Sequence, residues 1–176
     1  LSNGIKVHVL HTDYSPNSIA MRAISWGGSS LYPNSEYNLV DNAHMVQVGG
    51  WGQFSAIDLQ KKLSGKQVSV EPSIADRTEA LHGSCVKKDL ETMLQLTYLC
   101  FTSPRRDDDA YKSLLERTRN SLKNEDMNPI TALRDSIASV VYNNNVRALR
   151  MRTEDVDGLD YARVMEIYRA RFANAA

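Results

Sequence analysis

The order in which the hydrophobic period changes along the chain limits its fold more than any other feature of the sequence. Apolar residues alternate with polar ones in 5–10 and 67–74, and they occupy both odd and even positions in 19–26. Residues 78–86 form a further strand-like run. These patterns predict strands. The other apolar segments repeat every three or four residues, which predicts helices. Two strands, two helices, two strands and a long helical tail are typical of an α+β layer, with helices on one face of a mainly antiparallel sheet.

The local signals give approximate bounds for these elements. Strands 5–10 and 19–26 are expected to pair as a hairpin-like unit. A helix over 37–48 should end at Gly49-Gly50, because glycine disfavours helix interiors and tolerates positive φ. Ser55 or Asp58 can cap the next helix, and Asn128-Pro129 is a helix start signal. The predicted helices are 37–48, 55–63, 90–101, 111–122, 129–141 and 161–172, and those over 90–101 and 111–122 are expected to pack on the sheet.

The composition is that of a folded domain with no charge bias. The 176 residues are 42% hydrophobic and 24% charged, and Lys plus Arg equals Asp plus Glu at 21 each. Without a net positive field, a nucleic-acid partner is not expected. No apolar run approaches the roughly 20 residues that cross a bilayer, so no membrane span is expected either. We interpret 1–176 as a single domain, and its start at Leu1 suggests a fragment of a longer, multi-domain chain.

The two cysteines carry little functional information. Cys85 falls in a predicted strand and Cys100 in a predicted helix, and their spacing matches no zinc knuckle or redox motif. Buried thiols are the simpler interpretation. A disulfide stays open at this point, so the redox compartment does not follow from the cysteines.

Several short phrases, in a fixed order, connect the chain to a known family. They are Leu-Ser-Asn-Gly-Ile-Lys-Val at 1–7, Gly-Gly-Ser-Ser at 27–30, Phe-Ser-Ala and Leu-Ser-Gly-Lys within 54–66, Lys-Lys-Asp-Leu-Glu-Thr at 87–92, Phe-Thr-Ser-Pro-Arg at 101–105 and Arg-Ala-Arg-Phe at 169–172. In this order the sequence resembles the insulinase/pitrilysin family of inverted zincins. The resemblance covers nearly the whole chain and implies a LuxS/processing-peptidase-like metallopeptidase half-domain, one of two or four homologous halves that form a clamshell.

The zinc motif that this resemblance leads one to expect is degenerate. Active halves carry His-x-x-Glu-His on the first long helix, where two histidines four residues apart face one metal and the glutamate acts as general base. Here the corresponding residues are His44, Gln47 and Val48. The Gln47 amide cannot accept a proton from water, and Val48 has no lone pair for a metal. A single histidine does not hold zinc tightly, so we expect no catalytic, cofactor-binding or metal-ligating residue in this domain.

The family's third ligand, a glutamate, should fall within about 118–125. Glu116 and Glu125 bracket that window, while the Asn128-Pro129 signal downstream places the expected position nearer Ser121. The ligand is therefore expected to be absent.

Other candidate sites in the sequence are weaker. His8 and His11 lie three apart on a predicted strand and so point to opposite faces, and His82 belongs to another strand. Ser84-Cys85 lacks an elbow motif, and the glycine pairs lack a phosphate-binding lysine. The acidic run 107–109 is better explained as charge at a helix start than as a metal site.

These observations predict an inactive peptidase-like domain that walls a substrate chamber and holds peptide beside an active homologous half, in the same chain or in a partner subunit. No cofactor is expected here, and zinc is expected in the active half of the parent metallopeptidase. The alternatives are an active zinc peptidase domain with atypical ligands, and a structural subunit like the core proteins of respiratory complexes. The resemblance also implies that further strands complete the sheet and that the protein is exported, as in a bacterial periplasm.

Overall fold

A three-stranded antiparallel sheet forms one layer of the protein. The computed structural model describes residues 4–172. The strands are β1 (Ser18–Trp26), β2 (Val68–Ile74) and β3 (Thr78–Val86), and β3 is central in the order β1-β3-β2. The register places His82 of β3 between Arg22 of β1 and Glu71 of β2. Within residues 4–172, the outer edges of β1 and β2 carry no further strand. The predicted α+β class is confirmed.

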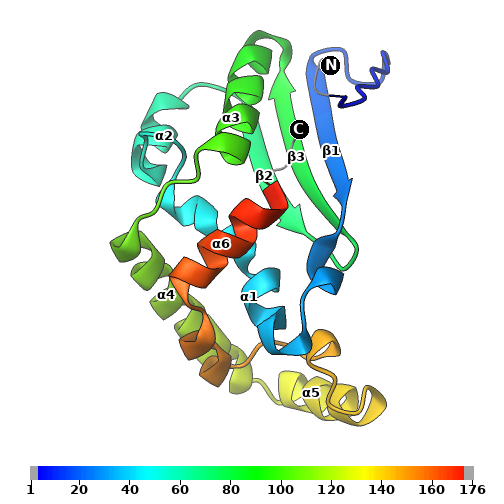
Figure 1. The fold of residues 1–176 in the computed structure, drawn as a ribbon, viewed down its shortest axis with the longest axis vertical. Coiled ribbons are helices and arrows are strands. Elements are labelled where there is room, and N and C mark those ends of the chain that lie inside the picture. Colours follow the sequence, from blue (N-terminus) through cyan, green and yellow to red (C-terminus); the bar gives the residue numbers. More distant parts are fainter. Residues whose placement is uncertain (1–3, 173–176) are drawn as a thin grey trace.

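Helices cover only one face of this sheet (Figure 1). On β3, Leu81, Gly83 and Cys85 are buried under the helical layer, while His82 and Ser84 between them are exposed, as the two-residue strand period requires. Gly83 permits the close approach, since a Cβ at this position would lie 2.9 Å from the Met21 side chain and 3.0 Å from Met93 Sδ. Met93 belongs to α3 (Leu90–Thr102), which packs across β2 and β3.

Apart from α1, the remaining α-helices agree in position with the sequence signals. Ser55 caps α2 (Ala56–Lys62) and Asn128 caps α5 (Pro129–Val141), each by accepting a backbone N–H. The others are α1 (Tyr37–Asp41), α4 (Asp108–Asp126) and α6 (Tyr161–Phe172). Short 3₁₀ segments span Gly28–Leu31, Asn34–Glu36, Ala43–Gly49, Lys87–Asp89, Val146–Ala148 and Thr153–Gly158.

The core is centred on α6, which crosses the helical layer in front of the sheet (Figure 1). Val164 and Tyr168 are fully buried. The Tyr168 hydroxyl donates a 3.0 Å hydrogen bond to the backbone carbonyl oxygen of Cys100, and its ring lies 5.8 Å from that of Trp51. Burial of the phenol with its hydrogen bond satisfied fixes α6 against α3 and the segment after α1.

Three sequence predictions about this architecture are wrong. Residues 5–10 form no strand, and Val9 is 90% exposed, whereas β1 pairs with β3. The hairpin-like unit is therefore absent. The helix over 37–48 is interrupted at Asn42. Finally, α4 packs against Ala43–Gly49 and Thr153–Gly158 and not mainly on the sheet.

The cysteine question is also answered. Cys85 and Cys100 are both free and buried. Burial raises the pKa of the Cys100 thiol to about 12, so this group stays a protonated, unreactive thiol at neutral pH.

Candidate functional site

The segment in which the sequence predicts a degenerate zinc motif is wound as a 3₁₀ helix. The α1 helix ends at Asp41, and Asn42 adopts non-helical dihedral angles. The chain then continues as a seven-residue 3₁₀ segment, Ala43–Gly49, and stops at Gly50 with φ 85°. Such segments rarely exceed three or four residues. The backbone geometry at this site is therefore unusual, and it decides which side chains share a face.

A 3₁₀ helix places residues i and i+3 above one another, which sorts this segment into three rows. The first row, Ala43, Val46 and Gly49, is buried. The second, Met45 and Val48, packs against the main core. The third contains His44, which is partly exposed, and Gln47, which is exposed. His44 and Val48 therefore belong to different rows, turned by about 120° from each other, whereas an α-helix would separate them by only about 40°.

The His44 imidazole already has a local hydrogen bond. Nδ1 lies 3.0 Å from the backbone carbonyl oxygen of Asp41 and donates to it, one turn back along the chain. This bond leaves Nε2 as the free nitrogen. Burial raises the pKa of the neighbouring Asp41 carboxyl, and the charge interaction with His44 acts in the opposite direction, lowering that pKa.

Close backbone packing holds the C-terminal end of this segment in place. A Cβ on Gly49 would lie 2.1 Å from the backbone oxygen of Arg105, so only glycine fits. Arg105 Nη1 donates a 2.8 Å hydrogen bond to the Gly49 carbonyl oxygen. The Gly52 N–H donates to the Ser103 carbonyl oxygen over 2.7 Å. The backbone segment that precedes α4 therefore lies directly against Gly49.

The window for the third ligand, on α4, holds no free glutamate aimed at His44. Glu116 forms a 2.7 Å ion pair with Arg119, and Glu125 lies 3.7 Å from Arg150. Both are exposed, as is Ser121 at the expected position. On α4, Tyr111 belongs to the core instead, and Leu114 and Leu115 pack against that core.

The other histidines lie elsewhere. His8 and His11 are exposed in the irregular segment before β1. His82 lies on the sheet face opposite the core, whereas His44 belongs to the helical layer, so the two do not converge. Among residues 4–172, no group of three or more His, Cys, Asp or Glu side chains is placed to hold a metal ion. The donor set around His44 thus does not fit zinc.

The acidic run before α4 has the structural role predicted for it. Asp107 is the N-cap and accepts the Ala110 N–H over 3.0 Å, while its other oxygen receives a 2.6 Å bond from Arg105 Nη1. The hydrogen bond from Arg105 is the main cause that lowers the pKa of Asp107, and the hydrogen bond from the Ala110 amide is the next. Asp108 pairs with Arg106 in the same way.

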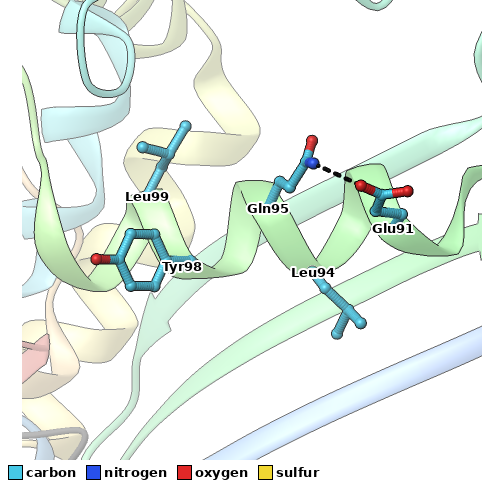
Figure 2. Close-up of a pocket in the computed structure, with 5 residues that line it drawn as sticks. All are labelled: Glu91, Leu94, Gln95, Tyr98 and Leu99. Atoms are coloured by element: carbon cyan, nitrogen blue, oxygen red, sulfur yellow. Dashed lines mark hydrogen bonds between the residues drawn. The ribbon is translucent and has the colours of Figure 1, made fainter.

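Two further surfaces were not predicted from the sequence. A hollow of about 530 Å³ lies on the outer side of α3, where Gln95 donates to Glu91 (Figure 2). With one carboxylate and mainly apolar walls it offers neither a metal ligand set nor an acid–base pair. On the open sheet face, Arg22, His82 and Glu71 form a row across all three strands, and Ser69 and Ser84 are hydrogen-bonded over 2.9 Å. Only the register, which the sequence does not give, brings these residues together.

No helix within residues 4–172 combines the length and the apolar character that a membrane crossing demands. This finding agrees with the absence of a long apolar run in the sequence.

Comparison with known proteins gives the class to which this architecture belongs. No family model matches the chain. The probable zinc protease PqqL of Haemophilus influenzae is 30% identical over 128 residues, which are 72% of this chain and 14% of that protein. This homology confirms the resemblance of the chain to zinc proteases of the insulinase/pitrilysin kind.

Two solved protease structures share this fold. The periplasmic protease PqqL from Escherichia coli superposes with a TM-score of 0.76 at 20% identity, over 97% of this chain and 19% of that one. A mutant of the ferredoxin protease FusC, in complex with Arabidopsis ferredoxin, gives 0.65 at 14% identity, over 88% and 17%. These two matches establish the fold. The chain spans less than a fifth of the length of each of these proteins.

Proposed function

We propose that this chain is a noncatalytic peptidase-like domain. It closes against an active, homologous half of a zinc metallopeptidase and forms part of the wall of the chamber that holds the peptide. Its own contribution is shape and peptide binding, and the active half holds the zinc and performs the hydrolysis.

The observation that carries this proposal is the placement of His44 and Val48 on different rows of the 3₁₀ segment Ala43–Gly49. The motif has lost its general base at Gln47 and its second ligand at Val48. The winding additionally turns position 48 toward the core, away from the row of His44. The residue types at positions 47 and 48 and the backbone geometry of this segment therefore both support a domain without catalytic zinc.

The sheet supplies the surface for holding a peptide. Within residues 4–172 no strand lies on the outer edge of β1 (Ser18–Trp26), and the strand has no proline to interrupt an added one. Ile24 and Trp26 are exposed apolar side chains on either side of Ser25. An extended peptide on this edge would gain main-chain hydrogen bonds together with apolar contacts at alternate positions.

The solved relative is a periplasmic protease, which supports an exported location for this chain. We place this chain in an exported protease, in the same compartment.

Peptide hydrolysis and zinc content, measured together, test the proposal. The polypeptide that carries this chain, with its active half, is expected to contain zinc and to cleave an unstructured fluorogenic peptide. The 176-residue chain should leave the same peptide intact, yet bind it. Hydrolysis by the chain itself, lost on chelation, would refute the noncatalytic assignment, and failure of the larger protein to cleave would refute the peptidase context.

A further inference from the structure

The α5 helix exposes its apolar side, which is unusual for a helix of an isolated domain. Its outward side consists of large apolar residues, among them Leu133, 61% exposed, and Ile137, 54% exposed. The partly buried side is small or polar and consists of Thr131, Asp135, Ala138 and Ser139. No residue of α5 is buried. Surface helices normally bury their apolar stripe, so this inversion marks an interaction surface.

Ion pairs, and not apolar burial, hold α5 in this orientation. Arg150 Nη2 donates to Asp135 of α5 over 2.8 Å and to Asp126 at the end of α4 over 2.6 Å. The Asn128 cap fixes the turn between the two helices. In Figure 1, α5 lies at the edge of the molecule farthest from the sheet, next to the end of α4. The apolar side is thus presented to the outside by a polar attachment on the opposite side.

The spacing of the outward residues indicates what kind of structure covers them. Ile130, Leu133, Ile137 and Val140 are separated by three, four and three residues, which is the a and d pattern of a helix–helix seam. In this frame Asp135 occupies position f, opposite the seam, where the structure pairs it with Arg150. A narrow seam of this kind packs against a second helix by inserting side chains between those of its partner.

Energetics and charge distinguish two sources for that second helix. A seam of two heptads is short, and free association of two copies costs about 4–15 kcal/mol in lost translational and rotational freedom. Within one polypeptide the effective concentration is on the order of millimolar, so a small seam suffices. Arg134 flanks the seam at position e. The outward side of α5 has no acidic residue that could form an ion pair with Arg134 of a second copy. Both arguments favour a different helix.

We propose that α5 docks onto a helix of a neighbouring domain in the same polypeptide, with an acidic residue opposite Arg134. This inference rests on the proposed function, in which the chain closes against other peptidase domains. It is supported by the comparison in which the matched segment makes up only 19% of the solved PqqL chain, so that the same fold there has much further polypeptide around it.

Hydrogen exchange of the α5 amides tests the docking. The larger polypeptide that carries this sequence is compared with the 176-residue chain, each with and without the double substitution Leu133→Asp with Ile137→Asp. The matched control replaces two equally exposed apolar residues outside α5, Leu94→Asp with Ile57→Asp. All four positions are exposed, and far-UV circular dichroism checks that each variant keeps its helices.

The docking predicts that α5 amides exchange at least tenfold more slowly in the larger polypeptide than in the 176-residue chain. The double α5 variant should lose this protection, and the control pair should keep it. Equal exchange in the two proteins would overturn the proposal. Protection that appears in the 176-residue chain as its concentration rises, and disappears in the α5 variant, would also overturn it and make a second copy the occupant.

Zinc content and peptide cleavage of the larger polypeptide separate this inference from the function on which it rests. If that polypeptide contains no zinc and cleaves no peptide, but still protects α5, then the peptidase context fails and the docking stands. If it is an active zinc peptidase with unprotected α5 amides, then the docking fails alone.

Discussion

Arg105 Nη1 lies 2.8 Å from the carbonyl oxygen of Gly49 and 2.6 Å from a carboxylate oxygen of Asp107, so one guanidinium joins the end of the 3₁₀ segment to the start of α4. The backbone of Arg105 takes part as well, because its N–H donates to the Gly50 carbonyl oxygen over 3.3 Å. The local geometry around the degenerate motif therefore depends on contacts that are distant in sequence.

Removing this guanidinium should destabilise the protein. We expect Arg105→Ala to lower the free energy of unfolding by about 1–3 kcal/mol, because a charge-assisted hydrogen bond and the partner of Asp107 are lost together. Urea unfolding measures this change. As a control, Arg106→Ala removes an exposed ion pair with Asp108 and should change stability much less than Arg105→Ala does. Equal effects of the two substitutions would contradict the role assigned to Arg105.

The close approach at Gly49 gives a second prediction. Gly49→Ala should cost more than about 2 kcal/mol, since its Cβ would lie 2.1 Å from the Arg105 backbone oxygen and the backbone must move. Gly158→Ala is the matched control, because a Cβ there meets no atom within 4 Å. Thermal unfolding of both variants tests the contrast. Similar melting temperatures would show that the packing on Gly49 is looser than described.

The pH dependence of stability should include Asp107. Its hydrogen bonds to Arg105 and to the Ala110 amide lower the pKa in the folded state. A depressed pKa contributes stability above the unfolded value of about 3.9, and this contribution is lost as the pH falls through the folded value. Asp107→Asn keeps a good cap but removes the charge. The stability difference between wild type and this variant should therefore be larger at pH 6 than at pH 3; a difference independent of pH would contradict the assignment.

Restoring the residues of the zinc motif by substitution should not restore zinc binding. In Gln47→Glu with Val48→His, the histidine at 48 still lies in the row that faces the core, about 120° from His44. The third ligand on α4 is also missing, with Ser121 at its expected place. We expect no stoichiometric zinc in the double variant, as measured by plasma mass spectrometry. Tight binding of one zinc would mean that the segment rewinds into an α-helix and that another side chain completes the site.

Local signals predicted much of this fold. The alternation in 67–74, and the caps at Ser55 and Asn128, depend on a few neighbouring residues, and each gave the right element. Residues 5–10 have an equally clear alternation but form no strand, because strand formation also depends on tertiary pairing, which periodicity does not specify.

The candidate site depended more on tertiary contacts. The identity of His44, Gln47 and Val48 shows in the sequence that the motif is degenerate. The change from α to 3₁₀ winding does not show there, because it accompanies the packing of Gly49 against a segment 56 residues later. For α5, the sequence gives the apolar seam, but the ion pair with Arg150 decides that this seam faces outward.

The central claim, that this domain has no zinc site of its own, is tested most directly by the zinc content of the purified chain after dialysis against a weak chelator. We expect far less than one zinc atom per chain, because His44 is the single metal-binding side chain left from the motif. One zinc per chain, retained against the chelator and released by replacing His44 with alanine, would contradict it.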